Sequence, residues 1–343
     1  MKKHLNTLYI TTKDVYLHKE GMTFVVEKEG EKVFQAPVHT IENIVCFGFK
    51  PISPALMSFC AENDIGISYL STTGRFLASV YGPQKGNVLL RTAQYKIADN
   101  EKDSLRIARN IVAAKITNYR KVIQRHLRNY PDDAESNLLK KAIDEMNKRM
   151  RLIKNVVNLN SLRGFEGDCS AIYFSCLKQL ITSQKEYFQF EKRSKRPPLD
   201  NVNALLSFLY VILANDIRSA IETTGLDSQV GFLHRIRSGR PSLALDIMEE
   251  FRAYLADRVA LNVINLGQVK KNDFEMRETG EIRINENARK TVIVTYQNRK
   301  QKTVIHPFLK EKTTLGMLPH IKAILMARYI RGDIEEYPPF YIK

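Results

Sequence analysis

Cysteine is scarce in this sequence. No two cysteines form a Cys-x-x-Cys pair, which argues against a structural zinc site or a thioredoxin-like redox pair. The start, Met1-Lys2-Lys3-His4, has no signal-peptide pattern. We therefore expect reduced thiols and a cytoplasmic location. The four cysteines of the 343 residues are Cys46, Cys60, Cys169 and Cys176.

Long apolar runs are absent as well. The longest extends from Ala204 to Ala214 and is interrupted by Ser207. A helix that spans a bilayer needs about 20 apolar residues. This run predicts a buried core helix, and we expect no membrane contact.

The signature motifs of several enzyme classes are missing too. The sequence contains no phosphate-binding G-x-x-x-x-G-K-[ST], no G-x-G-x-x-G after a strand, no G-x-S-x-G and no H-E-x-x-H. These absences argue against nucleotide hydrolysis, dinucleotide redox chemistry, and the common forms of serine or zinc hydrolysis.

Negative charge is in deficit, with 37 Asp and Glu against 53 Lys and Arg, a net charge of +16. Residues 1–95 are nearly balanced, with 10 basic and 8 acidic residues. Residues 96–343 hold 43 Lys and Arg against 29 Asp and Glu, a net charge of +14. A region this basic predicts a polyanionic partner, and nucleic acid is the commonest one. A basic protein without such a partner fits the composition as well.

The first part of the chain has the alternation typical of strands. Turn signals such as Lys19-Glu20-Gly21 and Glu29-Gly30 separate short apolar segments, which favours a mostly antiparallel β domain. Ser53 and Pro54 predict the cap and first turn of one short helix. The expected strands are Leu8 to Ile10, Val15 to Leu17, Phe24 to Glu27, Val33 to Ala36, Ile44 to Phe47, Ile67 to Leu70 and Phe76 to Tyr81.

The later part of the chain has helical periodicity instead. Apolar residues recur every three or four positions over 105–127 and 139–157, and a further helix is expected from Asn201 to Thr223. Residues 191–198 predict a basic loop, and Glu281 to Ile284 and Thr291 to Thr295 resemble strands. The expected fold is α+β: a small N-terminal β-rich domain, residues 1–90, followed by a larger, mainly α-helical domain, residues 91–343.

Gly164-Phe165-Glu166-Gly167 is one of two stretches that could carry chemistry. A carboxylate between two glycines lies where the backbone can turn sharply and where no bulky neighbour blocks a ligand. The alternative is a glutamate in the first turn of a helix, where it interacts with the helix dipole.

The second stretch is residues 231–252. Pro241 and Ser242 open a helix on which Asp246 and Glu249 are three residues apart and share a face. Two carboxylates and the nearby His234 suit Mn²⁺ or Mg²⁺ better than a structural zinc. A solvated acidic patch with a core histidine would give the same pattern. The arginines that follow the histidine could bind a phosphodiester, and they are Arg235, Arg237 and Arg240.

Together these stretches resemble the hallmarks of a known family. They are Gly164-Phe165-Glu166-Gly167, then Gly231-Phe232-Leu233-His234 leading into a helix of the form Leu-x-x-Asp-x-x-Glu-x-Phe-Arg from Leu243 to Arg252. The chain resembles the CRISPR-associated endonuclease and integrase subunit of the spacer-acquisition complex, closest to its type I-C branch. The resemblance extends to the Tyr337-Pro338-Pro339-Phe340 end. Many relatives have Asp where this chain has Glu249.

The resemblance implies an activity and a site. It implies a metal-dependent DNA endonuclease and integrase that inserts foreign DNA fragments into a CRISPR array as new spacers, by phosphodiester cleavage and 3′-hydroxyl strand transfer. One Mg²⁺ or Mn²⁺ would be bound by Glu166, His234 and Glu249, and Asp246 would be a further catalytic residue.

The resemblance also implies partners: double-stranded DNA, a second copy of the chain in a homodimer, and a small dimeric adaptation protein that bridges two such dimers. Two other functions remain open from the residues alone. One is a metal-dependent resolvase or repair nuclease for branched DNA, and the other is a DNA-bridging scaffold without catalysis.

Overall fold

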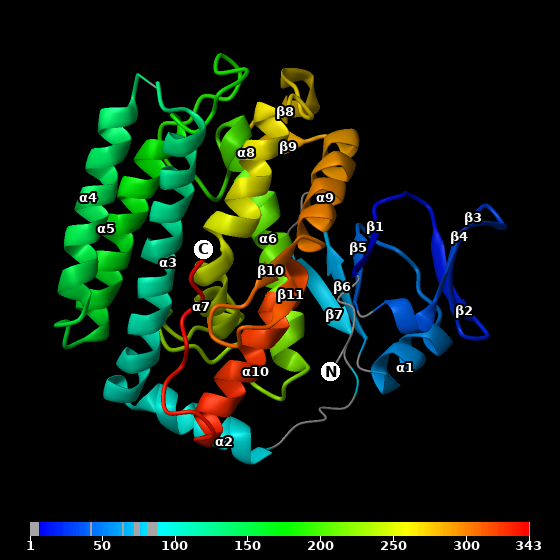
Figure 1. The fold of residues 1–343 in the computed structure, drawn as a ribbon. Coiled ribbons are helices and arrows are strands. Elements are labelled where there is room, and N and C mark those ends of the chain that lie inside the picture. The colour runs from blue at the N-terminus through cyan, green and yellow to red at the C-terminus, as the bar shows by residue number, and fades with distance from the viewer. Residues whose placement is uncertain are drawn as a thin grey trace. The chain divides into compact units, whose positions relative to one another are not determined.

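A computed structural model describes residues 7–342 except residues 42, 64, 72–75, 81, 83–87 and 133. Met1 to His4 and Tyr81, the last residue of an expected strand, therefore lie outside the described residues. The chain divides into two compact units, residues 1–87 and residues 88–343. The first is rich in strands and the second is mainly helical (Figure 1), which confirms the predicted α+β class.

The first unit contains every strand that the alternating pattern predicts, to within about three residues. Ser53 caps an α-helix, as predicted, because its hydroxyl accepts a hydrogen bond from the Leu56 N–H at 3.1 Å. The elements are β1 (Thr7–Ile10), β2 (Tyr16–Glu20), β3 (Thr23–Lys28), β4 (Glu31–Pro37), β5 (Asn43–Phe47), α1 (Pro54–Glu62), β6 (Gly66–Leu70) and β7 (Phe76–Val80), with a 3₁₀ turn at Val38–Thr40.

The expected antiparallel pairing is correct for only part of this unit. Strands β2, β3 and β4 form an antiparallel sheet, but the second sheet, in the order β1-β5-β6-β7, pairs β1, β5 and β6 in parallel. Only β7 is antiparallel there. For β5 and β6 the reason is the connection: α1 carries the chain from the end of β5 back to the start of β6, and a crossover of this kind joins parallel strands.

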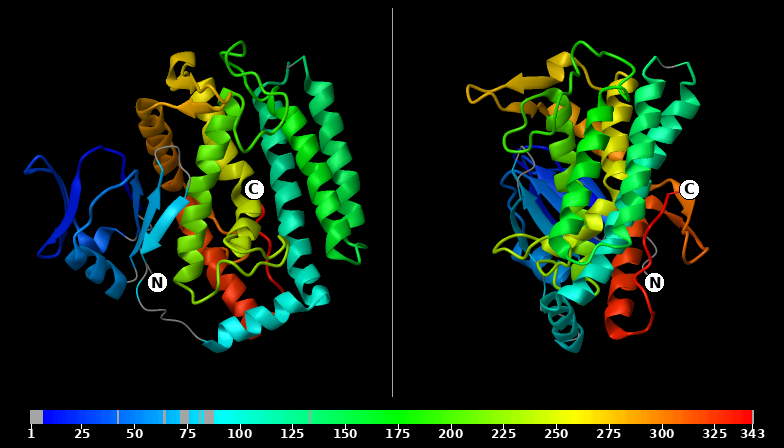
Figure 2. Two further views of the ribbon diagram at one scale, coloured as in Figure 1. Left: turned by 180° about the vertical axis from the view of Figure 1, so that it is seen from behind. Right: turned by 90° about the vertical axis from the view of Figure 1, so that its left-hand side faces the viewer.

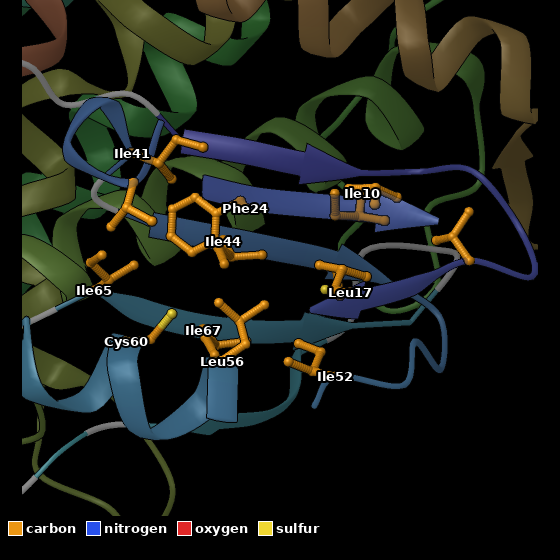
Figure 3. Packing of buried hydrophobic residues seen from close by; sticks show 14 residues of the cluster. Ile10, Leu17, Phe24, Ile41, Ile44, Ile52, Leu56, Cys60, Ile65 and Ile67 are labelled. Atoms are coloured by element: carbon orange, nitrogen blue, oxygen red, sulfur yellow. The ribbon is translucent and has the colours of Figure 1, made fainter. Parts of the chain in front are cut away.

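The core of the first unit lies between α1 and the strands. Leu56 and Cys60 of α1 point toward Ile44 and Ile67 of the parallel strands (Figure 3), and all four are buried. Burial raises the pKa of the Cys60 thiol to about 12, so it packs as a neutral apolar group. All four cysteines of the chain are buried and free.

The second unit is built around α3, the longest helix. It packs against α4, α5 and α7 (Figures 1 and 2), and α6 packs against α7 and α10. The helices are α2 (Val88–Asp99), α3 (Glu101–Asn129), α4 (Ser136–Ile153), α5 (Leu159–Leu177), α6 (Asn201–Glu222), α7 (Ser242–Phe251), a π-helical turn (Ala253–Asp257), α8 (Arg258–Asn265), α9 (Glu286–Lys300) and α10 (Leu318–Arg331).

The described part of this unit also contains two antiparallel strand pairs. They are β8 (Phe274–Met276) with β9 (Ile282–Ile284), and β10 (Thr303–Ile305) with β11 (Lys312–Thr314). The strand expected at Thr291 to Thr295 is wrong, because these residues lie within α9. Their β-branched side chains favour a strand locally. Packing decides otherwise, since Val292, Ile293 and Tyr296 form one buried helical face.

Helix α6 contains the apolar run of the sequence. Within the described residues it is the one helix long and apolar enough to cross a membrane by length and composition, and 72% of its most apolar window is buried in the protein. That burial is typical of a core helix, as predicted. The basic segment 191–198 that precedes it forms neither helix nor strand.

Candidate active site

Three helices bring charged side chains to one place in the second unit. Glu166 projects from α5, Glu249 from α7 and Lys115 from α3. The Lys115 ammonium forms an ion pair with Glu166 Oε1 and a second one, at 2.5 Å, with Glu249 Oε2. Lys115 is only 1% exposed. The two carboxylates that the sequence singles out, 83 residues apart in the chain, therefore share one buried cation.

The local structure at Glu166 differs from the expectation. Helix α5 begins at Leu159, where Asn158 accepts a hydrogen bond from the Ser161 N–H at 2.8 Å, so Glu166 lies in the middle of the helix. The two expectations for this stretch, a sharp turn at the glycines and a glutamate in the first turn of a helix, are therefore both wrong. Gly164 and Gly167 are exposed, and a Cβ at either would meet nothing within 4 Å. Helix α5 thus presents bare backbone on both sides of Glu166.

Asp246 organises the loop that leads into α7. Its carboxylate is fully buried and accepts four hydrogen bonds. Oδ2 accepts from the N–H groups of Phe232 at 2.6 Å and Leu233 at 2.9 Å. Oδ1 accepts from His234 twice, from its backbone N–H at 2.9 Å and from Nδ1 at 2.7 Å. Both the loop and the imidazole ring are therefore held by this one side chain.

The orientation of the imidazole follows from that contact. With Nδ1 donating to Asp246, the other ring nitrogen of His234, Nε2, lies 3.9 Å from Glu249 Oε1. A carboxylate behind one ring nitrogen is the usual way in which proteins orient a histidine that binds a metal through the other.

Gly231 is required by the same close packing. A Cβ at this position would lie 2.7 Å from Asp246 Oδ2 and 2.7 Å from the backbone carbonyl carbon of Ser242. Only glycine lets the loop approach the first turn of α7 closely enough for Asp246 to reach its N–H donors.

Glu249 is ionised although it is only 3% exposed. Burial acts to raise its pKa, but the positive charges of Arg252 and Lys115 and the nearby His234 outweigh burial and lower the pKa to about 2. Arg252 Nη2 lies 2.8 Å from Glu249 Oε1. Burial likewise acts to lower the pKa of Lys115, yet Glu249, Tyr119 and Glu166 raise it overall, so the lysine stays charged.

The C-terminal segment of the chain forms hydrogen bonds with α7 through Glu250. Glu250 is fully buried and accepts hydrogen bonds from the Tyr337 hydroxyl at 2.6 Å and from the Phe340 N–H at 2.7 Å. Lys322 of α10 forms an ion pair with the same carboxylate at 3.0 Å. The Tyr337 to Phe340 end that the sequence singles out is therefore part of the support of the site.

The structure brings Glu166, His234, Asp246 and Glu249 together, as the spacing and the motifs suggest. Lys115 was missed by sequence reasoning. A signal for it exists, because Lys115 follows Val112 by three residues and precedes Tyr119 by four, which places a positive charge on the apolar face of the α3 sequence.

The arginines lie at the edge of this site. Arg235 and Arg237 are exposed and Arg240 is half-buried. Arg235 Nη2 donates to Asn160 Oδ1 at 3.1 Å. Arg163 of α5, which the sequence analysis did not single out, donates through Nε to the Leu233 carbonyl at 2.6 Å and so ties α5 to the same loop.

The donor set fits a hard divalent cation. Within the described residues, no three His, Cys, Asp or Glu side chains already form a metal-binding group. Glu166 and Glu249 nevertheless offer carboxylate oxygens toward one shared positive charge, and the Nε2 of His234 faces Glu249. Carboxylates with one imidazole suit Mg²⁺ or Mn²⁺.

Comparison with known proteins agrees with this geometry. The family model described as CRISPR associated protein Cas1 matches residues 8–298. The protein named CRISPR-associated endonuclease Cas1 1 from Chlorobaculum tepidum is 46% identical over 340 residues, which cover 99% of each chain.

Solved structures share the fold. A chain of a Cas6-RT-Cas1–Cas2 complex superposes with a TM-score of 0.83 at 24% identity, over 100% of this chain and 37% of that one. A casposase bound to integration product gives a TM-score of 0.83 at 20% identity, over 97% and 93%. Family model, close relative and fold agree, and the chain belongs to the Cas1 family of CRISPR-associated endonucleases.

Proposed function

We propose that this chain is a metal-dependent DNA endonuclease and integrase that inserts foreign DNA fragments as new spacers into a CRISPR array. The observation that carries the proposal is that Glu166 and Glu249 converge on one buried positive charge while the Nε2 of His234 faces Glu249. The net charge of +14 over residues 96–343 supports DNA as the substrate. Membership of the Cas1 family supports the nuclease activity.

The metal ligands in this proposal are Glu166, Glu249 and the Nε2 of His234, with Mg²⁺ or Mn²⁺ as the cation. A bound cation of this kind polarises a scissile phosphate and stabilises negative charge on its non-bridging oxygens. Asp246 is a positioning residue, because four N–H donors already occupy its oxygens. It keeps the Nε2 of His234 turned toward Glu249.

Two reactions then share one site. Attack of water on a phosphodiester cuts DNA, whereas attack of a 3′ hydroxyl exchanges one P–O bond for another and joins the fragment to the target strand. The guanidinium groups of Arg235, Arg237 and Arg240 contact DNA phosphates, since their planar donors match phosphate oxygens. Catalysis and DNA binding belong to the helical part, residues 91–343, and the β-rich part is residues 1–90.

The proposed assembly contains double-stranded DNA, a homodimer of this chain, and a small dimeric adaptation protein that bridges two such dimers. The fold shared with a chain of a Cas1–Cas2 complex supports such a partner. The motifs support the type I-C branch, and the free, buried thiols support a cytoplasmic location. Nothing in the site favours a branched-DNA resolvase or a DNA-bridging scaffold.

The test is an integration assay with Mn²⁺, a short duplex and a plasmid that carries a CRISPR repeat. Glu166→Gln should abolish both cutting and joining. Asp168→Asn, which changes an exposed carboxylate on the same helix, should leave both activities unchanged. A duplex with 3′-deoxy ends should block joining but leave cutting intact. Joining that persists in Glu166→Gln would refute the site, and cutting of branched DNA without any joining would favour the resolvase.

A further inference from the structure

Lys115 is a buried charge that the proposed reaction does not use. Its ammonium lies between the carboxylates of Glu166 and Glu249, and its side chain is shielded from solvent. Lysine is almost never fully buried unless it is paired. Here it supplies the positive charge that a metal ion bound by the same two carboxylates would supply.

Lys115 and a metal ion cannot occupy this position together. A divalent ion bound to Glu166 and Glu249 would lie within a few ångströms of Nζ, where like charges repel strongly because little solvent screens them. The ammonium pairs with Glu166 Oε1 and Glu249 Oε2, and these oxygens belong to the two carboxylates that would coordinate the ion. Metal binding therefore requires that Lys115 move away.

Tyr119, one turn along α3, already lies beside the ammonium in its present position. Nζ lies 5.4 Å from the centroid of the Tyr119 ring, close enough for a cation–π contact. The Tyr119 hydroxyl is buried and, over the part of the chain that the structure describes, has no hydrogen-bond partner. A lysine has a flexible four-carbon stem, so a rotation of the side chain away from the carboxylates can keep the ring contact and give the ammonium this hydroxyl as an acceptor.

We infer that Lys115 is an internal counter-ion that holds the two metal-binding carboxylates before metal binds, and that metal binds by displacing it. The inference rests on the metal site proposed above. It assigns Lys115 two effects: it lowers the affinity for metal, and it stabilises the protein without metal.

The experiment measures Mn²⁺ binding to the full chain without DNA, from the electron paramagnetic resonance signal of free Mn²⁺. Lys115→Met keeps the length of the side chain and removes its charge, and Lys102→Met, an exposed lysine on the same helix, is the control. We expect Lys115→Met to bind Mn²⁺ with a Kd lower by about tenfold or more, because breaking a buried ion pair typically costs more than one such factor. Its Tm without metal should fall, and saturating Mn²⁺ should raise the Tm more than in the wild type.

Each other outcome has a defined meaning. A Kd equal to or higher than that of the wild type overturns the counter-ion role but leaves the metal site standing. Absence of Mn²⁺ binding in both the wild type and Lys115→Met refutes the metal site itself. If Lys115→Met is unfolded without metal, Mn²⁺ should restore folding, and failure to do so contradicts the inference, since the metal would then not replace the ammonium.

Discussion

Asp246→Asn is a small change in shape with a large expected effect. An amide offers one carbonyl oxygen and one NH₂ group, whereas the carboxylate accepts two hydrogen bonds on each oxygen, from Phe232 and Leu233 on one and twice from His234 on the other. Either orientation of the amide therefore turns an NH₂ group toward two N–H donors. Each buried donor without an acceptor costs about 1–3 kcal/mol. The free energy of unfolding should fall by about 2–6 kcal/mol.

Thermal unfolding followed by far-UV circular dichroism measures this loss, because the helical unit dominates the signal. For a unit of this size each kcal/mol corresponds to about 2–4 °C, so the Tm should fall by roughly 4–24 °C. The control is Asp168→Asn, an exposed carboxylate of α5, which should change the free energy of unfolding by less than about 0.5 kcal/mol. A Tm of Asp246→Asn equal to that of the control would refute the assignment of four hydrogen bonds to this side chain.

Three other variants test the packing around the site. Gly231→Ala should lower the free energy of unfolding by about 1–3 kcal/mol in a denaturant titration, since its Cβ meets backbone at 2.7 Å, whereas Gly164→Ala should not lower it. Tyr337→Phe removes a hydrogen bond to a buried carboxylate and should cost about 1.5–3 kcal/mol, and an equal loss in the more exposed Tyr341→Phe would contradict this. Burial raises the pKa of Asp257 from 3.8 to about 6, so the stability that this group contributes at low pH, about 3 kcal/mol, should be lost as pH rises from about 4 to about 7. Asp257→Asn should lose less, as Tm values across that pH range would show.

Much of the architecture is determined by short-range patterns. The alternation of apolar residues places seven strands, and Ser53 followed by Pro54 places the start of α1. The change to helical periodicity separates the two parts of the chain, and residues 191–198 are too rich in charge and proline to continue a helix. The motifs also select Glu166, His234, Asp246 and Glu249, because the residue types and their spacing are properties of the sequence.

What the sequence could not determine depends on contacts between distant segments. The parallel pairing of β5 with β6 follows from the path of the chain through α1, and β1 pairs with β5 although β2, β3 and β4 lie between them in the sequence. The helical state of 291–295 follows from a buried face that outweighs β-branched propensity. The place of Glu166 in the middle of a helix, in contrast, follows from a local feature, the cap that Asn158 forms eight residues earlier.

The candidate active site shows most clearly which features follow from sequence spacing and which follow from tertiary contacts. Sequence spacing puts Asp246 and Glu249 on one face of a helix but treats them alike. Tertiary structure separates their roles, because Asp246 meets four N–H donors of the preceding loop while Glu249 meets the cations Lys115 and Arg252. Lys115 is 51 residues from Glu166 in the chain, and no local pattern relates them. Only the packing of α3 against α5 and α7 brings the Lys115 ammonium between the two carboxylates. A buried ion has no water around it, so its partners are the groups that the fold places beside it.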